Sequence, residues 1–327
     1  MNKSFIITIS KIAFSIITLA ILLNITDISI FKSMLFSLSI KTICIGTVLV
    51  FMMQATNAFK LLVVMSGVNT NFRFMLKVNL IATFFSNIVP STLGKDIIRI
   101  LYLEKSGLFR ENATAAVGFD RVFGLISQLL ILTFAAIWYL QYNIRMNSII
   151  IFTFITICLL SALCYIIYVF RTRIKMFLLK LHIERIFDFN ELFVIIKQLI
   201  SSPYKLFQLS LASIFYQLLI IINIIILTSA LGGTINFLQA AIVSSTITLA
   251  ALIPASLAGL GFVEGAFMLL YNMISEQKET GLAVSISIRL LLLFPSFIGF
   301  ILFLYDKPKI KLLKEKLTGD KTENQLS

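Results

Sequence analysis

Long apolar stretches constrain this chain more than any other feature. Six of them hold twenty or more predominantly apolar residues, about the length that a helix needs to cross the hydrocarbon core of a bilayer. They cover residues 5–24, 36–58, 113–142, 148–170, 206–230 and 282–305. Because each stretch is continuously apolar rather than alternating, we expect helices. The sequence therefore predicts an all-α, polytopic membrane protein.

Composition supports this class, because 59% of the 327 residues are hydrophobic and only 13% are charged. A soluble fold would have too little polar surface to cover so much apolar area. The formal net charge of +13 is gathered in a few loops, where it sets membrane orientation and attracts anionic lipids. We expect no nucleic-acid partner. The three cysteines lie in apolar stretches and His182 is the only histidine, so we expect no metal site and no cofactor.

Two further apolar segments are interrupted. Residues 78–89 are followed by a break with Pro90 and Gly94, and then by the mixed stretch 95–109. Residues 237–253 are followed by a break with Pro254, Gly259 and Gly261, and then by residues 262–274. Paired interrupted segments at matching places in two halves are typical of a transport site at the membrane midplane.

Basic residues predict the orientation of these segments. The first interrupted segment has basic residues on both sides, so both its ends should be cytoplasmic; they are Lys60, Arg73, Lys77, Lys105 and Arg110. Residues 171–205 and the tail at 306–327 are also basic. The flanks of the second interrupted segment, 232–236 and 275–281, carry few charges and should lie outside.

The charge pattern thus predicts six crossings, two cytoplasmic termini and two re-entrant hairpins that open to opposite faces. Residues 1–147 and 148–305 would form an inverted repeat, because three crossings per half reverse the orientation of the second half. The alternative is eight full spans with two proline kinks. We expect a multi-pass protein of the cell (cytoplasmic) membrane.

The first break precedes a candidate anion site. If a helix resumes at Lys95, then Lys95 and Arg99 share one face, and Asp96 lies in the first turn. A helix N-terminus with nearby cations binds anions, and a lipid phosphate is the obvious anion in a membrane. The alternative is that Asp96 only caps the helix and Arg99 extends to the cytoplasmic surface.

Other charged residues lie inside predicted spans. Asp120 and Arg121 are about two turns into the third span, where unpaired charges cost several kcal/mol, so they are functional candidates. Arg121, Gly124 and Gln128 would form one stripe facing the bundle. The alternative is a structural ion pair with the first hairpin.

The second hairpin carries its own candidates. Glu264 should lie near the hairpin tip, and Arg289 lies two turns into the last span. Glu264 would either pair with Arg289 or face a cavity shared with Asp96 and Arg99. Ser210, Ser213 and Gln217 form a polar stripe on the fifth span that is typical of helix packing.

At these residues the sequence resembles the flippase-like transmembrane family, also known as the membrane region of lysylphosphatidylglycerol synthases. Three motifs, in order, carry the resemblance. They are a proline, glycine, Asp and Arg at Pro90, Gly94, Asp96 and Arg99; an Asp-Arg-x-x-Gly at Asp120, Arg121 and Gly124; and a proline, glycine-rich turn and Glu at Pro254, Gly259, Gly261 and Glu264. Lys95 and Val263 depart from the family pattern, in which a second glycine and a basic residue are usual.

The resemblance implies lipid translocation. It does not imply lysine transfer, because we expect a stand-alone member without the soluble aminoacyl-transferase domain. The leading hypothesis is a transporter of a polar or anionic lipid, whose headgroup site would be built from Lys95, Asp96, Arg99, Asp120, Arg121, Glu264 and Arg289.

Two rival functions stay open. One is a membrane-embedded transferase acting on a lipid, although the sequence contains no catalytic constellation or nucleotide-binding motif. The other is a non-transporting scaffold subunit of a cell-envelope enzyme. Besides membrane lipids, candidate partners are an enzyme of lipid or envelope synthesis and a second copy of this chain.

Overall fold

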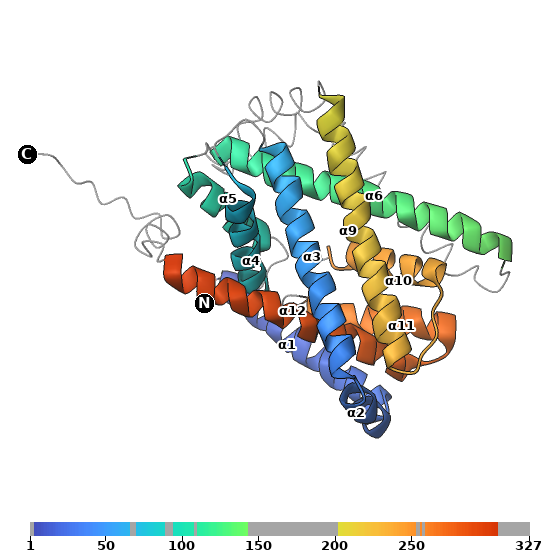
Figure 1. Cartoon of the computed structure of the whole chain (residues 1–327). Coiled ribbons are helices and arrows are strands. Elements are labelled where there is room, and N and C mark those ends of the chain that lie inside the picture. Colours follow the sequence, from blue (N-terminus) through green and yellow to red (C-terminus); the bar gives the residue numbers. More distant parts are fainter. Residues whose placement is uncertain are drawn as a thin grey trace, which may run out of the picture.

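A computed structural model describes residues 3–65, 70–88, 94–107, 110–142, 202–252, 256 and 259–306. These residues form ten α-helices and no strand (Figure 1). The helices are α1 (Lys3–Ile25), α2 (Ile28–Phe36), α3 (Ile40–Val64), α4 (Phe72–Ile88), α5 (Gly94–Lys105), α6 (Arg110–Tyr142), α9 (Pro203–Ala230), α10 (Phe237–Ala250), α11 (Phe262–Ser275) and α12 (Lys278–Asp306).

Within the described ranges, four helical segments are long and apolar enough to cross a membrane: α3, residues Asn112–Trp138 of α6, α9 and α12. They coincide with four of the six predicted stretches, so the prediction of an all-α membrane protein is confirmed. The predicted stretch 5–24 is helical as α1. The predicted stretch 148–170 lies outside the described residues.

The second predicted span begins later than the apolar pattern indicated. Asp27 caps the short helix α2 by accepting hydrogen bonds from the amides of Ser29 and Ile30, and α2 ends at Phe36. Ser39 then caps α3 by accepting from the amide of Thr42, and α3 continues to Val64. The apolar pattern could not locate this boundary, because α2 is itself apolar and merges with α3 in the sequence.

Each interrupted segment forms two helices that pack against each other, α4 with α5 and α10 with α11. In the second break, Gly259 and Gly261 have φ angles of 77° and 80°, which side chains rarely adopt. A Cβ on Gly261 would also lie 2.0 Å from Thr18 Oγ1 of α1, so only glycine fits there. Gly94 is the first residue of α5. The predicted breaks at Pro90 and Pro254 lie outside the described residues.

Helices α3 and α9 pack side by side, with the α4–α5 and α10–α11 pairs on opposite sides of them (Figure 1). The first arm of each pair packs against a long helix from elsewhere in the chain, α4 against α12 and α10 against α6. The approach of α4 to α12 is close, because a Cβ on Gly299 would lie 2.1 Å from the backbone oxygen of Leu80.

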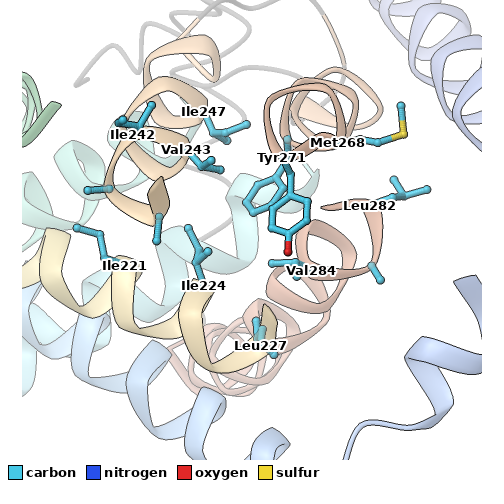
Figure 2. Close-up of a cluster of buried hydrophobic side chains, with 14 of the residues drawn as sticks. Ile221, Ile224, Leu227, Ile242, Val243, Ile247, Met268, Tyr271, Leu282 and Val284 are labelled. Atoms are coloured by element: carbon cyan, nitrogen blue, oxygen red, sulfur yellow. The ribbon is translucent and has the colours of Figure 1, made fainter. Parts of the chain in front are cut away.

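The largest apolar core lies among α9, α10, α11 and α12. Figure 2 shows Tyr271 of α11 in this core, near Ile224 and Leu227 of α9 and Val284 of α12. A second core joins α3, α4, α5, α6 and α9, and it includes the fully buried Leu61, Met75 and Leu103. The two cores fix the hairpin arms against the long helices, and so determine where the charged side chains lie.

Candidate functional site

A buried charged cluster forms where α3, α4, α5 and α6 meet. Asp120 of α6 is its centre: its Oδ1 lies 2.6 Å from Lys60 Nζ of α3, and its Oδ2 accepts a hydrogen bond of 2.8 Å from Arg99 of α5. The side chains of Lys60 and Arg99 are 3% exposed. Charges at this depth are stable only when they are paired, so Asp120 holds two cations together inside the protein.

Helix α5 supplies the second carboxylate. Asp96 lies in the first turn of α5, where a negative charge is favoured by the free backbone amides. It pairs with Arg121 of α6 and lies 3.9 Å from Arg99 on the same helix. The Arg121 side chain is 33% exposed, unlike that of Arg99. The cluster therefore has a buried side at Asp120 and an accessible side at Arg121.

Polar side chains extend the cluster into α4. Arg99 donates a hydrogen bond to the Asn79 side-chain oxygen, and the Asn79 amide donates to the backbone oxygen of Gln54 at 3.1 Å. Thr83 lies within hydrogen-bonding distance of the Gln54 side chain at 3.1 Å. These bonds fix the guanidinium of Arg99, because its partners come from two different helices.

Lys95 adds a cation beside these groups. Its side chain is partly buried, and it lies on α5 one residue before Asp96 and four residues before Arg99. None of the ion pairs between described residues includes Lys95. The cluster thus contains four basic side chains and two carboxylates. Lys60, Arg99 and Arg121 exceed Asp96 and Asp120 by one formal positive charge, and protonated Lys95 would add a second. This excess is suited to binding an anion.

A separate ion pair joins the second arm of the second hairpin, α11, to the long helix α12. Glu264 lies in the first turn of α11, where its Oε2 accepts a hydrogen bond of 2.7 Å from the Gly261 amide. Its Oε1 accepts from Arg289 of α12. Of the two arrangements expected for Glu264, the structure has the pair with Arg289, and Glu264 forms no ion pair with Arg99 within the described part of the chain.

The predicted polar stripes contribute to helix packing. Gln128 is buried and donates a hydrogen bond of 2.8 Å from α6 to the backbone oxygen of Ser245 in α10. Ser213 and Gln217 of α9 are also buried. Within the described residues no group of three or more His, Cys, Asp and Glu side chains that could hold a metal is found.

The structure excludes one of the two alternatives for Arg99 and corrects the expectation for Lys60. Arg99 does not extend to the cytoplasmic surface, because Asp120 binds it in the interior. Lys60 was counted as a loop charge, but α3 continues to Val64, and Lys60 is buried in the cluster. The sequence also gave no role to Asn79, although an asparagine within an apolar helix was an available signal.

The fold and the site define a multi-pass, all-α integral membrane protein with a buried cluster of ionised side chains. A family model described as "Lysylphosphatidylglycerol synthase TM region" matches residues 8–299, nearly the whole of the chain. The chain therefore belongs to that family, which confirms the resemblance of its three motifs. Neither a curated protein nor a solved structure matches the chain.

Proposed function

We propose that this protein moves a phosphate-bearing, anionic lipid across the membrane, with the headgroup held at the first hairpin. The observation that supports this most is the formal excess of positive charge on the partly exposed side of the cluster, where Lys95 and Arg121 lie at the start of α5, while Lys60 and Arg99 are paired with Asp120 in the interior. Basic side chains in excess of their carboxylate partners add little to the stability of the fold. An anionic ligand bound at the cluster would neutralise this excess of positive charge.

The three cations nearest the start of α5 would share the phosphate. Lys95 offers a point charge, and the backbone amides at the N-terminus of α5 favour an anion. Arg121 offers a planar guanidinium on the accessible side of the cluster, suited to two parallel hydrogen bonds with phosphate oxygens. Arg99 adds positive charge from the buried side of the cluster, where its hydrogen bonds to Asp120 and Asn79 fix the guanidinium.

The short hairpin helices support two re-entrant segments. Helices α5, α10 and α11 have 12, 14 and 14 residues, which correspond to about 18–21 Å at ~1.5 Å per residue. The hydrocarbon core is about 30 Å thick, so none of the three spans it alone. In this topology both termini are cytoplasmic, the first hairpin opens to the cytoplasm and the second opens to the outside.

The packing pattern supports an inverted repeat of residues 1–147 and 148–305. We compare α3, α4, α5 and α6 with α9, α10, α11 and α12, in that order. The contacts among these eight helices then occur in equivalent pairs. The packing of α4 on α12 corresponds to that of α10 on α6, and that of α3 on α12 corresponds to that of α9 on α6. Such repeats let one half move against the other around a fixed site.

The state of the carboxylates favours transport over a transferase reaction. A general base must be able to accept a proton from a reacting group. Here Asp120 is held by Lys60 and Arg99, Asp96 by Arg121, and Glu264 by Arg289. Each carboxylate is therefore already paired with a cation in this structure.

Transport in proteoliposomes tests this proposal. Purified protein is reconstituted with a fluorescent anionic phospholipid in one leaflet, and its appearance in the other leaflet is timed. Arg99→Gln should abolish movement, and Arg99→Lys should restore part of it, because lysine keeps the charge without the planar fork. The matched control is Arg110→Gln, since Arg110 is 39% exposed and pairs with Glu104 outside the cluster.

The proposal is wrong if Arg99→Gln purifies as a folded monodisperse protein and moves the anionic lipid at the parental rate. It is also wrong if a zwitterionic phospholipid moves as fast as the anionic one in the parent and in both Arg99 variants.

A further inference from the structure

In both halves the second arm of the hairpin and the long helix after it begin with the same spacing in the sequence. The same offset of 168 residues separates Gly94, the first residue of α5, from Phe262, the first residue of α11. It also separates Arg110, the first residue of α6, from Lys278, the first residue of α12. Two independent helix starts therefore align without a gap, which makes positions in the two halves directly comparable.

The two ion pairs occupy equivalent positions in this register. The offset of 168 residues converts Asp96 into Glu264 and Arg121 into Arg289. Each carboxylate is the third residue of its helix, and each pairs with an arginine 25 residues later. Their exposure matches too: the carboxylate side chains are 12% and 2% exposed, and the arginines are 33% and 28% exposed.

We propose that Asp96–Arg121 and Glu264–Arg289 are equivalent latches, one in each half, and that each closes one face of the transporter. Each latch fastens the start of a hairpin's second arm to the following long helix. This inference rests on the proposed function and its topology, since it assigns the first latch to the cytoplasmic face and the second to the outer face. Glu264 and Arg289 are then positioning residues, which hold the outer hairpin and touch no headgroup.

The rest of the charged cluster has no counterpart in the second half. The positions equivalent to Lys95, Arg99 and Asp120 are occupied by Val263, Phe267 and Ile288. Phe267 is 2% exposed and lies in the apolar core. At these three positions the second half therefore has apolar residues, although it keeps the latch. The proposal therefore assigns closing to the ion pair that both halves share, and lipid binding to the additional charged residues of the first half.

The contacts of Glu264 explain how the outer latch would work. One carboxylate oxygen binds the Gly261 amide in the turn, and the other binds Arg289 on α12. Gly261 also packs closely against Thr18 of α1, so the turn contacts α1 as well as Glu264. Ser256, which precedes this turn, is 3% exposed. Loss of the Glu264 charge should release the turn and expose Ser256 from the outside.

Thiol labelling from outside tests the latch without any lipid substrate. The reporter is Ser256→Cys in a chain whose three native cysteines are replaced by alanine, reconstituted in vesicles and treated with a membrane-impermeant maleimide. Adding Glu264→Gln should raise the labelling rate roughly tenfold, within the range of coupling energies for contacting pairs. Glu264→Arg with Arg289→Glu should restore slow labelling. Glu276→Gln is the control, since Glu276 is exposed at the end of α11.

The inner face supplies the reciprocal test. A Thr83→Cys reporter should react faster from the cytoplasmic side in Asp96→Asn and remain unchanged in Glu264→Gln. If Glu264→Gln does not purify, Arg289→Lys should raise Ser256→Cys labelling to a smaller extent. Equal labelling in parent, Glu264→Gln and Arg289→Lys would overturn the latch. Normal latch behaviour in a protein that moves no anionic lipid would instead sink the proposed function.

Discussion

Replacing Asp120 with asparagine tests the charged cluster at its centre. The change keeps the size of the side chain and removes the charge that Lys60 and Arg99 share. Both cations are 3% exposed, so Asp120→Asn would leave them buried with less compensation. Removing one partner of a buried ion pair costs about 3–5 kcal/mol. We therefore expect Asp120→Asn to lower the free energy of unfolding by that amount.

A second substitution should recover part of this loss. Lys60→Met replaces the ammonium group with a side chain of similar length and no charge. In the double variant Arg99 keeps its hydrogen bond to Asn79, so only one cation is left without its carboxylate. We expect a favourable coupling energy of about 1–3 kcal/mol between the two substitutions, as found for residues in direct contact.

Equilibrium unfolding in mixed micelles of a mild detergent and dodecyl sulfate gives the required free energies. Asp27→Asn is the control for the substitution itself, because Asp27 is exposed and caps α2, where asparagine serves equally well. The reasoning is refuted if Asp120→Asn loses less than about 1 kcal/mol, or if the losses from Lys60→Met and Asp120→Asn simply add.

Two other predictions follow from single contacts, and a third follows from the predicted topology. Gly299→Ala places a Cβ 2.1 Å from the backbone of α4 and should cost about 1–3 kcal/mol in the same unfolding assay, whereas Gly118→Ala, with open space around it, should be neutral. Asp306→Asn breaks the ion pair between Lys77 and Asp306, whose side chains are 32% and 23% exposed, and should lower the free energy of unfolding by less than about 1 kcal/mol. Cysteines at Asn236 and Gln277 should both react with an impermeant thiol reagent from outside; labelling on opposite sides would show that the second segment spans the membrane.

The helices could be predicted from the sequence because apolar length and Pro/Gly breaks are local signals. The start of α5 was predicted one residue from Gly94, and the break before α11 at Gly259 and Gly261 was located by its glycines. The break between α2 and α3 was missed, since both helices are apolar and only the caps at Asp27 and Ser39 mark it.

The candidate site could be predicted only where its residues are close in sequence or clearly out of place in a span. Asp96, Arg99 and Asp120 met this condition. Lys60 did not, because a lysine at the end of an apolar stretch has the pattern of a loop residue. Its partner Asp120 lies 60 residues away, so tertiary packing of α3 on α6 decides its burial. No local pattern contains that information.

Native mass spectrometry of the purified protein tests the central claim most directly, since it measures which lipid the cluster retains. The protein is offered equal amounts of an anionic and a zwitterionic phospholipid with the same acyl chains. We expect the parent to retain the anionic lipid, Lys95→Gln to lose that preference, and Lys105→Gln, which changes an exposed lysine on the same helix, to keep it. Retention of both lipids in equal amounts by the parent, or an equal loss of preference in both variants, would contradict the assignment of the headgroup site to this cluster.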